Sequence, residues 1–304
     1  MTTFCDLNLN VTNLTEKLID QLVESTIKLG YNEVALSVDF EFPAAGSKTN
    51  EQKKKENRQL VLVPPPKNYK IQQKLANRLD LFCRKIKVYS RINIKIKPND
   101  INTYLHHLKS KEVMAYDIIA LEPVDSQVLL YLCNNNFNAD LISIKSGIEC
   151  GLTDKHLIRP LNNAVNSMSL HFELCYSASI SSSTERRDFI MAGRCLTFNT
   201  KSKGLIISSG ASNSNNLRGP YELLNIVKLF DITEQESHQI IRRNNHQVLT
   251  NSFCRKHTAA GMVYLNEPND LNKLTNALLM YRERLDREKT EEKIIESPKK
   301  KIKN

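Results

Sequence analysis

Seven short apolar segments, each of strand length, alternate along this chain with longer segments that have a helical period. They span residues 4–10, 33–42, 85–97, 116–122, 140–144, 171–176 and 204–210. Consecutive parallel strands need a crossover of a dozen or more residues, and this crossover is most often a helix. The alternation therefore predicts an α/β fold with about seven parallel strands. Its regularity favours a TIM-barrel-like (β/α) barrel over an open sheet.

The length of the alternating region predicts where the barrel ends. A (β/α) barrel typically takes about 250 residues, and the alternation with one further helix reaches residue 250 of the 304. We therefore expect a barrel domain over residues 1–250 and a partly helical C-terminal extension over residues 251–304. The extension ends in SPKKKIKN, a basic cluster typical of a nuclear import signal and also of an ordinary lysine-rich tail.

The charge of the chain points to an anionic partner. Lys and Arg outnumber Asp and Glu by 43 to 33, a formal net charge of +10, and such a balance favours nucleic acid. The longest apolar runs fall far short of the roughly 20 residues of a membrane-spanning helix. We therefore expect RNA, and no membrane, as a partner.

Residues 67–97 carry most of this net charge, with ten Lys or Arg and one acid. In the strand expected at residues 85–97, the even positions 86, 88, 92, 94 and 96 are apolar and the odd positions 85, 87, 89, 91, 95 and 97 are basic or aromatic. This period of two places the two sets on opposite faces. A strand buried on both faces in a parallel sheet should be apolar throughout. We therefore expect the basic face to reach solvent, RNA or a protein partner. Its candidate RNA contacts are Lys87, Arg91 and Lys95.

The segment from residue 171 to residue 221 is a second basic region. It reads as strand, polar loop, helix, strand, polar loop and the start of another helix, and Ser182 with Glu185 forms a capping box before the helix at residues 184–199. Basic residues recur every seven positions on this helix, so they share one face. The candidate phosphate contacts are Arg186, Arg187, Arg194, Lys201, Lys203 and Arg218.

Each of these features also has a purely structural explanation. Basic helix faces occur for solubility alone. The loop before Pro220 has two equally good explanations. It forms either an anion cradle or a tight loop-to-helix junction in which Arg218 pairs with a nearby carboxylate.

The sequence contains no recognisable catalytic constellation. Its seven histidines are scattered, and it has no HxH, HExxH, P-loop, GxGxxG or GxSxG motif. We therefore predict no catalytic residues, no metal ligands and no cofactor.

An ordered series of motifs runs from residue 116 to residue 249, and FCDLNLN and SVDF precede it. The series reads YDIIALEP, DLISI, Arg159-Pro160, FELCYS, SSSTERR, LIISSGA and LRGPYELLNIVKLFDITEQE. In this order and spacing the motifs resemble the thirty-kilodalton protein subunit of ribonuclease P and its relative RNase MRP, a family of eukaryotes and archaea.

The resemblance implies a TIM-barrel-like fold similar to that of the PHP phosphoesterases. It also implies a non-catalytic subunit of an RNA enzyme that removes the 5′ leader from precursor tRNA, with a role in rRNA processing. The implied partners are the RNase P and MRP RNAs, precursor tRNA and other protein subunits, including a small partner subunit. The implied location is the nucleus, including the nucleolus.

Two other functions are compatible with the sequence. The first is a metal-dependent PHP-type phosphoesterase, although PHP enzymes carry a metal-binding His-x-His on the first strand, where this chain reads Phe4-Cys5-Asp6-Leu7-Asn8. The second is a protein–protein adaptor whose basic faces meet acidic partners.

Overall fold

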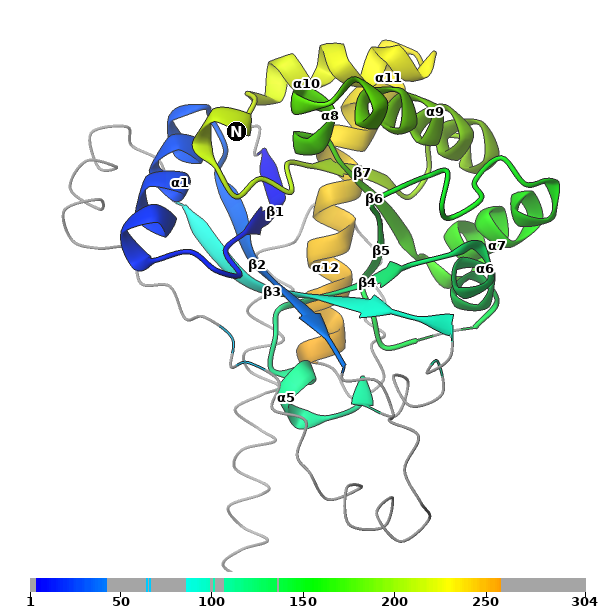
Figure 1. Ribbon diagram of the computed structural model, residues 1–304, viewed down its shortest axis with the longest axis horizontal. Helices are drawn as coiled ribbons and strands as arrows, with labels where there is room; N and C mark the ends of the chain where they lie inside the picture. The colour runs from blue at the N-terminus through cyan, green and yellow to red at the C-terminus, as the bar shows by residue number, and fades with distance from the viewer. Residues whose placement is uncertain are drawn as a thin grey trace, which may run out of the picture. The chain divides into compact units, whose positions relative to one another are not determined.

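Seven parallel strands form one sheet that closes on itself (Figure 1). The strands are β1 Cys5–Asn10, β2 Glu33–Glu41, β3 Lys87–Ile96, β4 Ile118–Pro123, β5 Leu141–Ile144, β6 His171–Cys175 and β7 Leu205–Ser208. Each strand pairs in parallel with the next. A parallel bridge between Leu9 and Ala211 brings the first and last strands together. The prediction of a TIM-barrel-like fold with about seven parallel strands is confirmed.

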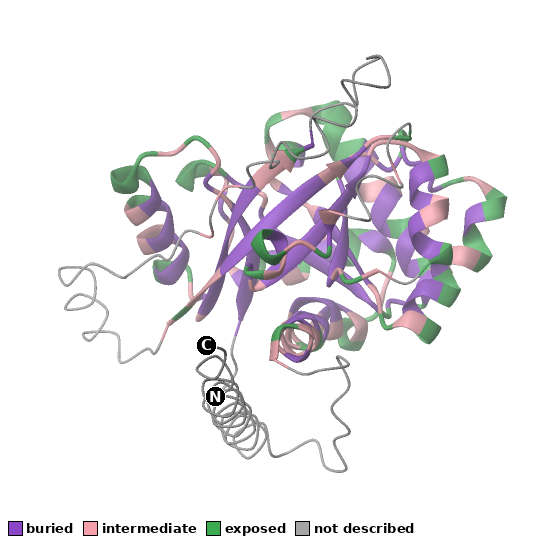
Figure 2. Cartoon of the chain, turned by 90° about the horizontal axis from the view of Figure 1, so that it is seen from below, coloured by how far each residue is buried: buried purple, intermediate pink, exposed green. Residues whose placement is uncertain are grey.

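Helices connect the strands and cover the barrel. The α-helices are α1 Glu16–Lys28, α5 Lys111–Met114, α6 Ser126–Asn134, α7 Ile158–Met168, α8 Ser177–Ser181, α9 Ser183–Thr200, α10 Pro220–Val227, α11 Glu234–His238 and α12 Asn244–His257. A π-helical turn, η5 Gln239–Arg243, joins α11 to α12. Figure 2 shows the strands buried and the outward faces of the helices exposed.

The core has two parts because each strand buries both faces. Inside the barrel, small and aliphatic residues such as Leu7, Ala35 and Ile206 form one cluster, and Val248 packs against them. Between the strands and the helices lies a larger cluster, to which β3 contributes Ile92 and Ile94. Burial of both faces is what a parallel barrel requires.

The expectation that the basic face of β3 reaches solvent is wrong for the middle of the strand. Arg91 and Asn93 are 0% and 5% exposed, although they belong to the polar set of the period-two pattern. The alternation correctly separates two faces of the strand. However, the polar face meets the interior of the barrel, where its groups bond to other buried polar groups.

Local signals around the helices are mostly confirmed. Thr233 and Glu236 form a capping box at the start of α11, with the Thr233 Oγ1 accepting from the Glu236 N–H at 3.3 Å. Pro220 occupies the first turn of α10, as predicted. The polar loop expected between β6 and α9 contains the short helix α8 instead.

The structure describes residues 4–42, 64, 66, 86–98, 101, 107–135 and 137–257. The chain divides into two compact units, Met1–Ser252 and Phe253–Asn304. The basic run at residues 67–85 and most of the predicted C-terminal extension, including the SPKKKIKN tail, lie outside the described residues. Within the described residues, no helix is both long and apolar enough to span a membrane.

Candidate nucleic-acid interface

Helix α9 carries the exposed basic stripe that the sequence predicts. The Ser182 hydroxyl accepts from the Glu185 N–H at 3.4 Å and caps the start of the helix, which ends where Lys201 takes a left-handed conformation with φ 52°. Gly193 allows a close approach to Phe230, because a Cβ at this position would lie 2.3 Å from Phe230 Cε1. The opposite face of α9 is left to solvent.

The three basic residues with seven-residue spacing all lie on this exposed face. Arg187 and Lys201 have no ion pair among the described residues. Arg194 is partly engaged, because its Nη2 lies 3.0 Å from Asp231 Oδ2 and its Nε donates to the Leu229 carbonyl at 3.1 Å. Two of the three cations are therefore free to meet an external anion.

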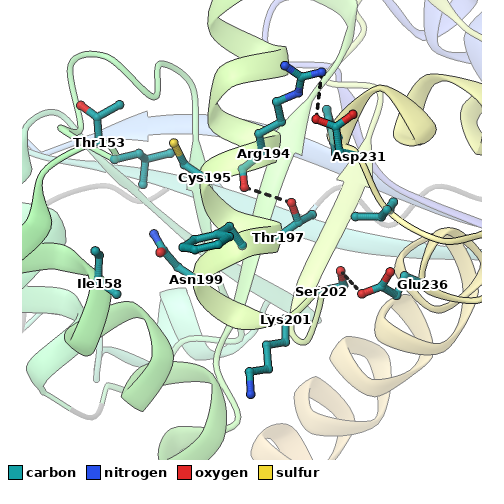
Figure 3. A pocket seen from close by; sticks show the side chains of 14 residues that line it. Thr153, Ile158, Arg194, Cys195, Thr197, Asn199, Lys201, Ser202, Asp231 and Glu236 are labelled. Carbon is teal, nitrogen blue, oxygen red and sulfur yellow. Dashed lines mark hydrogen bonds and ion pairs between the residues drawn. The ribbon is translucent and has the colours of Figure 1, made fainter.

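A surface pocket of about 770 Å³ lies beside the stripe (Figure 3). Arg194 and Lys201 line it, and between them Phe198 exposes 83% of its surface. Glu236 also lines the pocket, but its carboxylate already accepts from the Ser202 hydroxyl at 3.1 Å. Single-stranded nucleic acids bind surfaces of this kind, because their bases stack on exposed aromatic rings and their phosphates pair with neighbouring cations.

Arg186 and Arg218, two other candidates, are bonded to backbone carbonyls of their own loops. Arg186 donates to the Ser179 and Ile180 carbonyls at 3.0 and 3.1 Å, at the end of α8. Arg218 donates to the Leu217 carbonyl at 2.7 Å, and its Nε lies 3.9 Å from a Glu222 carboxylate oxygen. Of the two explanations for the loop before Pro220, the structure shows the loop-to-helix junction in which Arg218 lies beside a carboxylate.

The remaining candidates do not join α9 in one surface. Arg91 is buried inside the barrel, so its prediction as an RNA contact is wrong. Lys87 lies at the amino-terminal end of β3 and pairs with Glu33 at 3.3 Å, whereas Lys95 is half-buried at the other end of the strand. Lys203 is exposed in the turn between α9 and β7.

The centre of the barrel holds a buried ion pair instead of an open cavity. Arg91 Nη1 donates to Glu173 Oε1 at 2.6 Å, and its Nη2 pairs with Oε2 of the same carboxylate. The guanidinium also donates to the Leu7 carbonyl and to Asn93 Oδ1, both at 2.7 Å. Asn8 adds a third donor to the carboxylate at 3.2 Å. The guanidinium of Arg91 and the carboxylate of Glu173 therefore neutralise each other at the barrel centre.

The electrostatics of this pair favour the charged forms. Burial alone would raise the pKa of the Glu173 carboxyl, but Arg91 outweighs burial and holds that pKa below its usual range. Burial likewise opposes the charge on Arg91, and Glu173 raises the pKa of the guanidinium. Each group stays ionised because the other is present.

A second buried acid lies nearby. Asp6 Oδ1 accepts from the Ser209 N–H at 3.1 Å and from the Asn8 N–H at 3.2 Å, and so helps to join β1 to the end of β7. Burial raises the pKa of Asp6 to about 6, and the two hydrogen bonds offset part of this effect. Neither Asp6 nor Glu173 is among the residues predicted from the sequence. The available signal was a charged residue in the middle of an apolar strand segment.

One group of potential metal ligands occurs within the described residues. Ligand atoms of Cys5, Glu33 and His246 lie within 4.8 Å of one another. Cys5 and Glu33 begin β1 and β2, so this group lies at the amino-terminal end of the barrel, opposite the end where such barrels carry their active sites. Glu33 is moreover paired with Lys87. The arrangement gives no support to a PHP-type phosphoesterase site.

Comparison with known proteins identifies the family. The profile of the family described as RNase P subunit p30 matches residues 3–257. The chain belongs to this family. Ribonuclease P protein subunit p30 of Mus musculus is 28% identical over 271 residues, which cover 86% of this chain and 90% of the mouse protein.

Two further comparisons are with a plant protein and with a solved structure. Protein GAMETOPHYTE DEFECTIVE 1 of Arabidopsis thaliana is 30% identical over 199 residues, covering 62% of this chain and 32% of the plant protein, so the match spans about a third of the plant protein's length. A chain in the cryo-EM structure of archaeal ribonuclease P with mature tRNA has the same fold, with a TM-score of 0.53 and 16% identity over 87% of this chain and 99% of that chain.

Proposed function

We propose that this chain is a non-catalytic, RNA-binding subunit of the ribonuclease P ribonucleoprotein. In this role it supports removal of the 5′ leader from precursor tRNA in the nucleus. Through RNase MRP it also takes part in rRNA processing in the nucleolus. Family membership over residues 3–257 supports the assembly, and the match to nearly the full length of the mouse subunit supports a eukaryotic particle. Its partners are the RNase P and MRP RNAs, precursor tRNA and other protein subunits, including a small one.

The observation that carries the non-catalytic role is the ion pair at the barrel centre. Barrel enzymes place reactive groups at the carboxyl ends of their strands. Here the Arg91 guanidinium bonds to Glu173, Leu7 and Asn93, so the opposite charges of Arg91 and Glu173 are engaged with each other and not with a substrate. We infer that the RNA performs the chemistry and that this protein positions the RNA.

The exposed face of α9 is the surface best suited to the RNA backbone. Arg187 and Lys201 are exposed and have no ion pair within the described part of the chain, and Phe198 between them offers a ring for stacking. Contacts of this kind hold phosphates and set the salt dependence of binding, but they do not read sequence.

The salt dependence of RNA affinity tests this surface. Arg187→Ala/Lys201→Ala removes two phosphate contacts, and each contact contributes about 0.7–0.9 to the slope of log affinity against log salt. We expect the slope to become shallower by about 1.5. Lys109→Ala/Lys111→Ala, which also removes two exposed lysine charges, before and within α5, serves as the control. An unchanged slope in the α9 variant would refute this surface.

The RNA that co-purifies with the tagged full chain tests the assembly. Recovery of the RNase P and MRP RNAs supports the proposal. Bound zinc or manganese in stoichiometric amount, with turnover of a generic phosphoester, would support a phosphoesterase instead. A complex that survives RNase treatment with all its proteins would favour the adaptor function.

A further inference from the structure

A second, smaller pocket lies at the amino-terminal ends of β6 and β7, and its volume is about 350 Å³. Its walls come from the end of α7, the turn that precedes β7, the π-helical turn η5 and α12. All of its lining residues belong to the unit Met1–Ser252. A volume of this size falls at the lower end of the range for small-ligand sites, about 300–1,000 Å³.

One wall of the pocket is a regular stripe of polar side chains. Gln239, Arg243, Gln247 and Asn251 line it at intervals of four residues along one helical run. Side chains with this spacing lie on the same side of a helix. The run begins with the π-helical turn, a rare geometry that occurs frequently at functional sites. The four side chains therefore form one continuous polar wall of the pocket.

The pocket is positively charged. None of the eleven described residues that line it is Asp or Glu, and two of them are Lys203 and Arg243. Both side chains are exposed and neither has an ion pair in the described part of the chain. An anion that enters the pocket would therefore meet two uncompensated cations and no repelling carboxylate.

Buried hydrogen bonds hold these two cations in place. Asn244, next to Arg243, is fully buried, and its Nδ2 donates to the Leu205 carbonyl at 2.6 Å and to the Ser202 carbonyl at 3.3 Å. These two carbonyls lie on either side of Lys203 in the chain. Gly204 lets the turn approach α7 closely, because at its φ of 66° a Cβ would lie 2.9 Å from Val165 Cγ1. The turn that carries Lys203 is thus bonded to the helical run that carries Arg243.

A buried histidine forms the end of the pocket. His171 is 4% exposed and lines the pocket at the start of β6. Burial lowers its pKa, an effect that Gln247 and the Ser169 backbone partly offset. Its Nδ1 nevertheless has no hydrogen-bond partner of good geometry among the described residues. A buried polar atom without a partner is costly, and a ligand in the pocket would supply one.

We propose that this pocket binds one unpaired nucleotide of the RNA partner, with its phosphate between Lys203 and Arg243. The side-chain amides of Gln239 and Gln247 both donate and accept, as the edge of a nucleobase requires. Val165 and Leu170 supply apolar surface for the base. Proteins recognise RNA mostly at unpaired nucleotides, whose bases can leave the stack. This inference rests on the proposed RNA-binding function and adds a site distinct from the exposed face of α9.

The test compares single-stranded RNA with duplex RNA of equal length, both binding to the full chain. Lys203→Gln/Arg243→Gln should weaken single-strand binding about tenfold and change duplex binding less than twofold. The control Lys155→Gln/Arg159→Gln removes one Lys and one Arg that are exposed near the start of α7 and outside this pocket. It should leave both affinities unchanged.

A second variant and a second measurement keep the test decisive if the double variant misfolds. Gln247→Glu changes an exposed side chain and adds a carboxylate to the pocket, so it should also weaken single-strand binding selectively. Ultraviolet crosslinking of the single strand should label the peptide that contains residues 239–251. Inorganic phosphate that competes with RNA only in the parent protein would show that the pocket takes the phosphate.

The outcomes distinguish this inference from the broader function. Equal losses for single-stranded and duplex RNA, or no loss in either pocket variant, would overturn the pocket while RNA binding by the parent stands. A parent chain that binds neither RNA would overturn the proposed function itself.

Discussion

The ion pair inside the barrel leads to a quantitative prediction about stability. Glu173→Gln leaves the Arg91 charge buried opposite a neutral amide, and Arg91→Met leaves the Glu173 carboxylate without its partner. Breaking a buried pair by removing one member costs about 3–5 kcal/mol, and both side chains here are 0% exposed. We therefore expect each single variant to lose about 4 kcal/mol of unfolding free energy.

The double variant Arg91→Met/Glu173→Gln should lose much less than the sum of the two single losses, because it leaves no unpaired charge. Interacting neighbours typically show coupling energies up to about 3 kcal/mol, and we expect a value near that limit. Urea unfolding of the full chain, followed by far-ultraviolet circular dichroism, measures all four proteins.

The pair Lys97–Glu41 is a matched control near the carboxyl end of β3. Its two side chains are 44% and 43% exposed, and exposed pairs contribute about 0–1 kcal/mol. Additive losses at Arg91 and Glu173, with a coupling no larger than that of the control pair, would refute a buried pair at the barrel centre. A loss of RNA affinity in Arg91→Met at unchanged stability would refute its assignment to the interior.

Two further predictions concern single side chains. Because burial raises the pKa of Asp6 from 3.8 to about 6, the folded state binds the proton more tightly and loses stability as pH rises from about 4 to about 6. At about 1.4 kcal/mol per pKa unit, the difference between 6 and 3.8 corresponds to about 3 kcal/mol. Asp6→Asn should therefore gain about this much relative to the parent between pH 3.5 and pH 7, and a pH-independent difference in urea midpoints would contradict this. Gly193→Ala should lose about 1–3 kcal/mol in the same assay, since the added Cβ would lie 2.3 Å from the Phe230 ring; a loss below 0.5 kcal/mol would mean that α9 lies farther from that ring.

The fold could be predicted from the sequence because its signals are local. Alternating segment lengths mark strands and helices, and Thr233 with Glu236 or Pro220 marks a helix start without reference to the rest of the chain. The inside of the barrel could not be predicted in this way. Arg91 and Glu173 are separated by 82 positions, and a period of two reveals that β3 has a polar face without revealing what that face meets.

The site was only partly predictable for a related reason. Seven-residue spacing places Arg187, Arg194 and Lys201 on one face of α9, and the structure exposes all three. Which groups a long side chain contacts, however, depends on its neighbours in space. Arg186 and Arg218 bond to nearby backbone carbonyls, and no pattern of residue types reveals that.

The closure between β1 and β7 determines when this protein can finish folding. Leu9 and Ala211, which form the bridge, are separated by about 200 residues. At a synthesis rate of about 5–20 residues per second, β1 leaves the ribosome roughly 10–40 s before its second neighbour exists. During that interval its outer edge has no partner, and contacts between such distant residues form slowly. Any partner that recognises the closed barrel must therefore wait until translation has passed residue 211.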